Sequence, residues 1–349
     1  MSAGMYCRGC GYDLQHLPVN HCAECGRTFD PANPKTFSKQ SGSTARLRAI
    51  RRVAGLLIAL GILAGLGLYG LWWPWHYNNA AMLMVQRRGG IMHTKIVGPI
   101  WLRRLLGNRG GFLLERVTSI DLVPYSRRRV KATDADLAAL EGLSDLQELT
   151  LRWTLITDAG LKYLKHLTAL QKLDISETQI TGADPEHSLS NLTNLSFLDL
   201  GGSDVNDAGL QNLAGLSNLQ TLGLDDTRVT AAGLEHLKNL ANLQWLQLWG
   251  TPVTNAGLKW IGEMAGLQSL ELNQSNITDA GLSSLQNLSN LQDLEINGTA
   301  VSDAGLKYLE KLKGLQNLDV SSTSVTLKGA RALKRILPNC GIEVGFTRF

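Results

Sequence analysis

Four of the five cysteines lie close together near the beginning of the chain, in two pairs that each leave two residues between the thiols. The pairs are Cys7 with Cys10 and Cys22 with Cys25, and eleven residues separate them. Two such pairs can surround one Zn(II) ion tetrahedrally, and the glycine that follows each pair allows the tight turn that this geometry needs. Four thiolates leave no open coordination position, so the sequence predicts a structural zinc ion in residues 1–29.

The same cysteines leave two other readings open. They could form disulfides or be unrelated thiols, or they could hold an iron–sulfur cluster. His16 and His21 could replace a thiolate ligand, although we interpret both as surface residues of the ribbon. The fifth cysteine, Cys340, has no partner among the later residues, so we expect a buried, small apolar side chain rather than a nucleophile.

A run of 23 residues without a charge, 53–75, is the next feature of the chain. As a helix it would be about 34 Å long, which matches a hydrocarbon core of about 30 Å, so we predict one transmembrane helix. Four arginines precede it in the basic linker, 30–52, and no Lys or Arg follows until Arg87. This asymmetry places the N-terminus in the cytoplasm and the rest of the chain outside it. Gly61 and Gly65 form a G-x3-G pair through which two such helices could form a homodimer.

The rest of the chain repeats one unit. A Thr, Ser or Asn before an Asp-Ala-Gly-Leu-like run recurs every 24 residues, with a single spacing of 25. Nine registers at a fixed period predict a solenoid. The nine positions are Thr133, Thr157, Thr181, Asn206, Thr230, Thr254, Thr278, Ser302 and Thr326.

Within each unit the apolar residues recur first every second and then about every third residue, as in a short strand followed by a helix. The hydroxyl before Asp-Ala-Gly suits a helix N-cap, and the Asp favours the helix dipole. A second column of hydroxyl residues, such as Thr154 and Thr227, is expected to bond the buried backbone of the turns. The expected fold class is therefore α/β, with parallel strands on a concave face and short helices on a convex face.

Residues 117 to 344 resemble leucine-rich repeats of the 24-residue Thr-Asp-Ala-Gly-Leu type. Together with the cysteine segment and the apolar run, the chain is similar to membrane-anchored leucine-rich repeat proteins of planctomycete-type bacteria. The resemblance implies protein binding and brings no catalytic residues. On this reading an N-terminal cap occupies 76–116, the repeats occupy 117–336, and a cap strand occupies 337–349.

The concave face is predicted to be acidic. Residues 1–130 carry 18 Lys and Arg against 5 Asp and Glu, whereas residues 131–349 carry 16 against 25. Ten carboxylates and only two bases, Arg152 and Lys172, occupy the positions that point outward from the strands. The ten are Glu148, Asp174, Glu177, Asp199, Asp225, Asp226, Glu271, Asp293, Glu295 and Asp319.

Aromatic residues lie in the middle of this acidic face. We predict that Phe197, Trp245 and Trp249 contact a ligand there, together with Asp225 and Asp226, and that Trp153 lies one or two coils away. Exposed aromatic side chains on a polar surface are typical of protein-binding sites. A basic or extended protein segment is favoured over a glycan, and nucleic acid is disfavoured because the carboxylates repel phosphate.

No pattern in the sequence predicts an enzyme. The chain has no Gly-rich phosphate loop, no G-x-S-x-G and no H-E-x-x-H. Two functions from different classes remain open. One is a membrane-anchored binding protein that displays its repeats outside the cytoplasm, and the other is a structural envelope spacer or assembly protein without a dedicated ligand.

Overall fold

The computed structural model divides the chain into two units, Met1–Trp72 and Trp73–Phe349. Among the described residues no helix is long and apolar enough to cross a membrane. The predicted span at 53–75 lies outside these residues, and so do Gly61 and Gly65. The structure describes residues 5, 7–8, 14–15, 20–22, 26–35, 76–97, 104, 114–123, 131–345 and 347–348.

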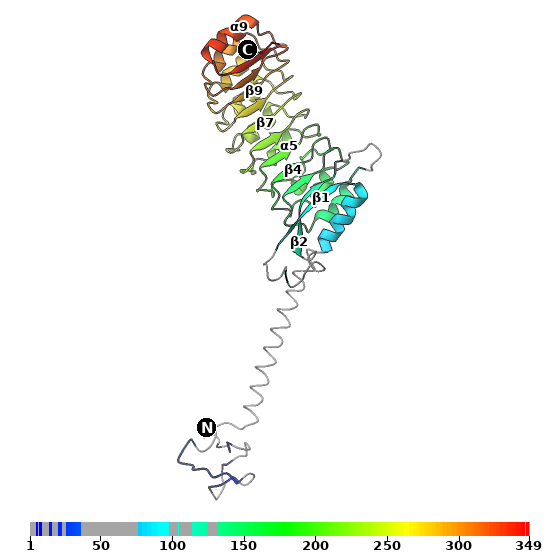
Figure 1. The fold of residues 1–349 in the computed structure, drawn as a ribbon, viewed down its shortest axis with the longest axis vertical. Coiled ribbons are helices and arrows are strands. Elements are labelled where there is room, and N and C mark those ends of the chain that lie inside the picture. Colours follow the sequence, from blue (N-terminus) through cyan, green and yellow to red (C-terminus); the bar gives the residue numbers. More distant parts are fainter. Residues whose placement is uncertain are drawn as a thin grey trace. The chain divides into compact units, whose positions relative to one another are not determined.

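One sheet organises the second unit, and its strands lie side by side in chain order (Figure 1). Within the described residues it has twelve strands. Pairing is parallel from β2 to β11 and antiparallel at both ends, between β1 and β2 and between β11 and β12. The strands are β1 (Ile91–Ile96), β2 (Glu115–Asp121), β3 (Glu148–Thr150), β4 (Lys172–Asp174), β5 (Phe197–Asp199), β6 (Thr221–Gly223), β7 (Trp245–Gln247), β8 (Ser269–Glu271), β9 (Asp293–Glu295), β10 (Asn317–Asp319), β11 (Gly341–Val344) and β12 (Thr347–Arg348).

Short helices return the chain from one strand to the next, mostly one α-helical turn and often a 3₁₀ turn after it. At Asp184 to His187, where the repeat pattern is interrupted, the α-helix is replaced by the 3₁₀ turn η3. The helices are α3 (Asp134–Leu137), η2 (Ala138–Leu140), α4 (Asp158–Leu161), η3 (Pro185–His187), α5 (Asp207–Gln211), α6 (Ala231–Leu234), η4 (Glu235–Leu237), α7 (Asn255–Ile261), α8 (Asp279–Leu282), η5 (Ser283–Leu285), η6 (Gly305–Leu309) and α9 (Leu327–Ile336).

The register is constant from coil to coil. Leu246 of β7 lies opposite Leu222 of β6 and Leu270 of β8. All three leucines are buried in one continuous core that runs along the repeats. Because the register does not change, each position of the repeat forms a straight column across the sheet, and the residues on either side of the central leucine share the opposite, concave face.

The turns after the strands are held by the predicted column of hydroxyls. Thr227 Oγ1 donates to the carbonyl oxygen of Leu224 at 2.6 Å, and Thr251 Oγ1 donates to that of Leu248 at the same distance. The residue before the hydroxyl adopts positive φ, as Asp226 and Gly250 do at +51° and +66°. The prediction that these hydroxyls bond the turn backbone is confirmed for seven of the eight, each within its own coil. The exception is Ser275, whose buried hydroxyl has no partner among the described residues.

The N-terminal end of the solenoid is covered by a helix over residues 76–88 and by β1. The helix buries Ala81, Met84 and Val85 against the core. β1 was not predicted from the sequence, and in the structure this strand is mostly exposed. The amphipathic helix expected near 99–106 lies outside the described residues apart from residue 104.

The C-terminal end has two strands where the sequence predicted one. β11 continues the parallel series beside β10, and β12 then folds back antiparallel to it. Cys340, just before β11, is fully buried, and burial raises the pKa of its thiol to about 11. This thiol therefore stays protonated at neutral pH and packs as an apolar side chain, as expected.

Candidate binding surface on the concave face

Three neighbouring columns of side chains form the concave face. The first two are the outer positions of each strand, and the third follows the next core residue. The first column contains Glu148, Lys172, Phe197, Thr221, Trp245, Ser269, Asp293 and Asn317. The second contains Thr150, Asp174, Asp199, Gly223, Gln247, Glu271, Glu295, Asp319 and Glu343. The third contains Arg152, Ser176, Gly201, Asp225, Trp249, Asn273, Asn297 and Ser321.

Two tryptophans of one coil mark the middle of this surface. Trp245 and Trp249 expose 42% and 39% of their surface. Phe197 is half-buried in the same column as Trp245, with Thr221 between them. The backbone N–H of Trp249 donates to Asp225 Oδ1 at 2.8 Å, so the carboxylate is fixed beside the indole-bearing coil.

The carboxyl groups near these rings lie in an environment that disfavours their charged form. Burial, followed by the nearby carboxylates of Glu271, Asp199 and Asp226, raises the pKa of Asp225 to about 6. Burial also raises the pKa of Asp199, and Asp174 and Glu177 add to the effect. The negative charge in the centre of the face is thus only weakly compensated by the chain itself.

A gap in the second column lies next to these carboxylates. Gly223 stands between Asp199 and Gln247, and a Cβ at Gly223 would come within 2.6 Å of Asp199 Oδ1. The glycine therefore leaves room for the Asp199 carboxylate. Asp199 borders this gap, and Asp225 follows Gly223 two residues later in the same coil.

Trp153 lies apart from this central group. Its coil is two coils from that of Phe197 and four from that of the other two tryptophans, farther from these than the sequence suggested. It occupies the turn position with φ of +59°, and the guanidinium carbon of Arg152 lies 4.4 Å from its ring centroid. Asp226, Gln274 and Ser322 occupy the same turn position in later coils, also with positive φ.

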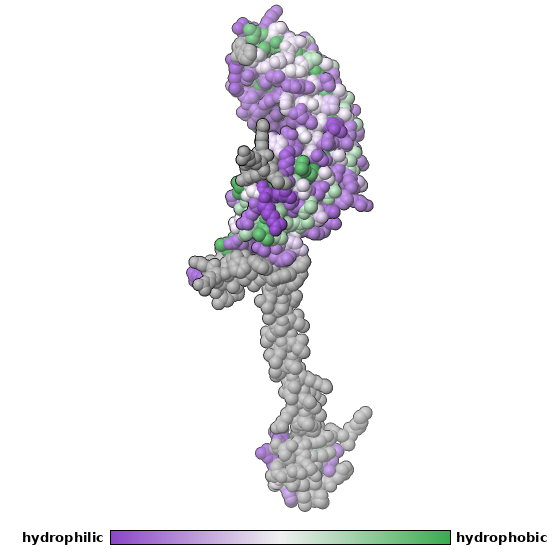
Figure 2. All heavy atoms as spheres, turned by 90° about the vertical axis from the view of Figure 1, so that its right-hand side faces the viewer, coloured by the Kyte–Doolittle hydropathy of each residue, from purple (hydrophilic) through white to green (hydrophobic). Residues whose placement is uncertain are grey.

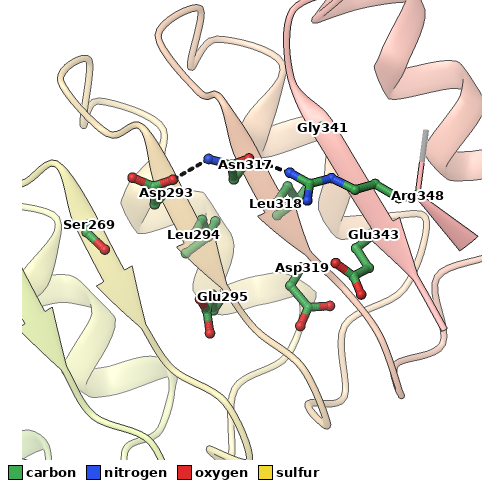
Figure 3. Close-up of a pocket in the computed structure, with 10 residues that line it drawn as sticks. All are labelled: Ser269, Asp293, Leu294, Glu295, Asn317, Leu318, Asp319, Gly341, Glu343 and Arg348. Carbon is green, nitrogen blue, oxygen red and sulfur yellow. Dashed lines mark hydrogen bonds between the residues drawn. The ribbon is translucent and has the colours of Figure 1, made fainter. Parts of the chain in front are cut away.

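The C-terminal end of the face has a pocket of about 430 Å³ (Figure 3). The sequence analysis did not predict this pocket. Arg348 reaches across Gly341 and donates to Asn317 Oδ1 at 2.8 Å, and Asn317 Nδ2 donates to Asp293 Oδ1 at 2.6 Å. Glu343 joins the carboxylates of the second column here. The contribution of Arg348 depends on β12, which the sequence did not reveal.

Much of the described surface is hydrophilic, and Figure 2 shows hydrophobic side chains on that side of the repeats only in small, separate areas.

A model of the family described as Leucine Rich repeat matches residues 191–214 and 267–285. The repeats are leucine-rich repeats. No curated protein matches the chain.

Three solved structures are similar to the chain. An internalin (inlF) from Listeria monocytogenes is similar with a TM-score of 0.50 and 23% identity, over 60% of this chain and 57% of the internalin. Internalin C2 of the same organism gives a TM-score of 0.47 and 27% identity, over 61% and 84%. A TDR receptor gives 0.47 and 19%, over 65% and 42%. The chain thus spans little more than half the length of inlF, and the likeness shows the fold.

The predicted zinc ligands are only partly described. Cys7 and Cys22, one from each pair, are both buried in a small cluster with Leu14 and Phe29. Gly26, after the second pair, has φ of +68°, the left-handed turn expected of a metal-binding knuckle. Cys10 and Cys25 lie outside the described residues, within which no three metal-binding side chains come together. Two of the four predicted thiols are therefore described, and the zinc site stays a prediction.

Proposed function

We propose that the leucine-rich repeats bind a protein partner, and that an extended, basic segment of this partner lies along the concave face. The observation that supports this most is the raised pKa of Asp225, at about 6, beside two exposed tryptophans. A carboxylate with a raised pKa gains free energy when a cation arrives, because the cation relieves the repulsion among its neighbours. The centre of the face therefore favours a Lys or Arg side chain.

The aromatic rings add to the same preference. Trp245 and Trp249 can each stack on a guanidinium group, and tryptophan is the strongest of the aromatic side chains in such contacts. Aromatic residues near the centre of an interface contribute a large share of binding free energy. An extended segment also suits the columns, because its alternate side chains would point into the face at a regular spacing.

A binding experiment with the full chain in detergent tests this proposal. Labelled ten-residue peptides of alternating Arg and Gly are compared with peptides of alternating Glu and Gly. We expect the basic peptide to bind, more weakly as salt increases. Asp199→Asn with Asp225→Asn, and separately Trp245→Ala with Trp249→Ala, should each weaken binding at least tenfold.

Two changes on the convex face, Tyr163→Ala and Trp260→Ala, serve as the matched control, since both remove a half-buried ring from the opposite side. Binding that is lost in this control but kept in the concave variants would contradict the assignment. If neither peptide binds the wild type, the function as a structural spacer is favoured instead.

We further propose that residues 53–75 anchor the chain in a membrane as a single span, with the cysteine segment and its structural Zn(II) in the cytoplasm and the repeats outside. The support is the charge-free run and the four arginines before it. Phosphatase fused after Phe349 should be active, and a reporter that works only in the cytoplasm should stay dark. The opposite pattern would reverse the proposed orientation.

Self-association through Gly61 and Gly65 is part of this proposal, because two glycines at this spacing allow close approach of two helices. Gly61→Leu with Gly65→Leu should lower the signal in a membrane dimerisation assay. Ala59→Leu with Ala64→Leu, in the same run but outside the pair, is the control. An equal signal from wild type and the glycine variant would remove the homodimer.

A further inference from the structure

A second hollow lies along the edge where the strands begin, beside the concave face. Its volume is about 580 Å³, within the range of ligand sites. Five successive coils contribute to it, and no charged residue lines it. The lining residues are Gln147, Ala169, Gln171, Asn194, Ser196, Asn218, Gln220 and Asn242. We call this hollow the amide groove.

The asparagines of the amide groove are fixed by the fold. Asn194 Nδ2 donates to the backbone carbonyl of Thr168 at 2.7 Å, Asn218 Nδ2 to that of Thr193 at 2.9 Å, and Asn242 Nδ2 to that of Ser217 at 2.8 Å. Each bond joins one coil to the coil before it. The bond fixes the orientation of each amide, and the amide oxygen keeps its capacity to accept from a ligand.

The glutamine side chains of the groove, unlike the asparagine side chains, are not needed to join neighbouring coils. The stacking bonds at this position are made by the backbone, as in the bond from Gln171 N to Gln147 O at 2.8 Å. The side chains of Gln147, Gln171 and Gln220 are exposed, so neither packing nor backbone pairing requires an amide there. A ligand that uses both a donor and an acceptor at each coil would account for them.

Ser196 deepens the middle of the amide groove. The other strands from β3 to β10 have Gln immediately before them, and Ser196 takes this place before β5. The shorter side chain removes most of one glutamine from the row. Its hydroxyl remains near the backbone, where it donates to Gln171 O at 3.2 Å.

We propose that the amide groove binds a neutral oligosaccharide. Sugar hydroxyls are donors and acceptors at once, and they match amides that offer both. Successive coils present these amides about 4.8 Å apart, a spacing of the order of one pyranose ring. Trp245 follows Gln244 one coil beyond Gln220, and its exposed ring offers a stacking surface for the apolar face of a sugar at the end of the groove.

The charge pattern separates this ligand from the partner proposed for the concave face. The two carboxylates at the centre of the concave face, Asp199 and Asp225, lie in its second and third columns, and the amide groove lies on the far side of the first column. A basic segment would gain nothing from uncharged amides, whereas a neutral sugar chain avoids the cost of displacing water from carboxylates. The inference therefore does not depend on the proposed protein binding.

The test uses the full chain in detergent on an array of neutral and acidic glycans, followed by titration with the hexasaccharide of the glycan that binds best. We expect a neutral glycan to bind. Ser196→Gln fills the groove with the side chain that the other coils carry, so it should fold normally and weaken binding at least tenfold. Gln171→Leu with Gln220→Leu removes the amides at similar size and should do the same.

Gln316→Ser is the matched control, because it makes the reverse exchange in the same row outside the amide groove, and binding should not change. Asp225→Asn should also leave glycan binding intact while it weakens binding of the basic peptide, which separates the two proposals. The proposal is overturned if no neutral glycan binds, if only acidic glycans or peptides bind, or if Ser196→Gln binds its glycan as the wild type does.

Discussion

The carboxylate of Asp207 accepts two hydrogen bonds from Thr230, the residue that begins the next coil: one from the backbone N–H at 2.7 Å and one from the hydroxyl at 2.6 Å. The same clamp, from one coil to the next, recurs along the repeats. It joins Asp134 to Thr157, Asp158 to Thr181, Asp279 to Ser302 and Asp303 to Thr326. Asn255 makes an amide version with Thr278: its Oδ1 accepts from the Thr278 N–H, and its Nδ2 donates to the Thr278 hydroxyl. The Asp of the repeat thus holds neighbouring coils together.

Removal of this clamp should destabilise the repeats. Asp207→Ala leaves the N–H and hydroxyl of Thr230 without their charged acceptor, and we expect a loss of about 2 kcal/mol. Asp204→Ala is the control, since its carboxylate pairs with Arg228 at 2.7 Å on the exposed surface and should contribute less than about 1 kcal/mol. Urea unfolding followed by circular dichroism measures both, and equal losses would contradict the role of the clamp.

Restoring a missing clamp should stabilise the chain. Ala231 occupies the Asp position before Thr254, whose N–H and hydroxyl therefore lack this acceptor. Gly257 of the next coil lies opposite Ala231, since a Cβ at Gly257 would be 3.5 Å from the Cα of Ala231. Because glycine has no Cβ, there is room at this point for an Asp side chain at position 231. Ala231→Asp should add about 1 kcal/mol. Ala232→Asp places the same charge one residue later on the exposed side, and a gain as large from that change would show that only the helix dipole is at work.

The period, the strand and helix order and the buried leucines could be predicted because each depends on local spacing in the sequence. The role of Asp207 could not, because an Asp after an N-cap looks the same whether it serves the helix dipole or the next coil. The glycine of the repeat is explained only by the stacked coils: a Cβ at Gly233 would collide with the Asp207 carboxylate.

The turns and the candidate binding surface could also be predicted from the sequence only in part. Glycine at positive φ, as at Gly202 and Gly250, is a recognisable signal, but Trp153 and Asp226 adopt the same conformation without it. The outward direction of Trp245 followed from its place in the repeat. The raised pKa of Asp225 did not, since it depends on carboxylates brought together from other coils.

The charge of Asp225 should make the stability of the repeats depend on pH. Its pKa rises from 3.8 to about 6 on folding, so between these values the folded chain holds the proton more tightly than the unfolded chain. Stability should therefore fall as pH rises from about 4 to about 6. Asp225→Asn removes this penalty and should be more stable by about 1 kcal/mol at pH 7.5 after allowance for solvent screening, with little difference at pH 4.

The control for this pH effect is Asp226→Asn, which removes the exposed neighbouring carboxyl. Thermal unfolding at pH 4, 5, 6 and 7.5 is the measurement. A constant difference between wild type and Asp225→Asn over this range would show that the carboxyl is not coupled to folding. Added basic peptide should reduce the difference at pH 7.5, because it compensates the same charge.

One zinc ion per chain should copurify with the full-length protein, because four thiolates complete its coordination. Native Cys7, Cys10, Cys22 and Cys25 should resist alkylation until a chelator is added. Cys340→Ala should change neither result, since that thiol is buried in the repeats. Less than one zinc per chain from a reduced preparation made without chelator, or full alkylation of the native protein, would exclude the zinc site.

Arg88 and Asp136 join the N-terminal helix to the first coil. The guanidinium Nε and Nη2 donate to Asp136 at 2.7 to 2.9 Å, and the N–H and hydroxyl of Thr133 donate to the same carboxylate at 2.8 and 2.9 Å. Burial works against the charge, but the bonds from Thr133 and Arg88 together lower the pKa of Asp136 below 3.8. The resulting stability is present above about pH 4 and is lost as pH falls through the lowered value.

Arg88→Gln should therefore cost about 1 to 2 kcal/mol at pH 7, because it leaves a half-buried carboxylate without its charged partner. The loss should appear as faster hydrogen exchange in α3 and β2, next to the cap, while β7 to β10 keep their protection. Lys172→Gln breaks the exposed pair with Glu148, at 3.1 Å, and should change exchange little. If Arg88→Gln leaves exchange in α3 and β2 unchanged at pH 7, the ion pair does not secure the cap.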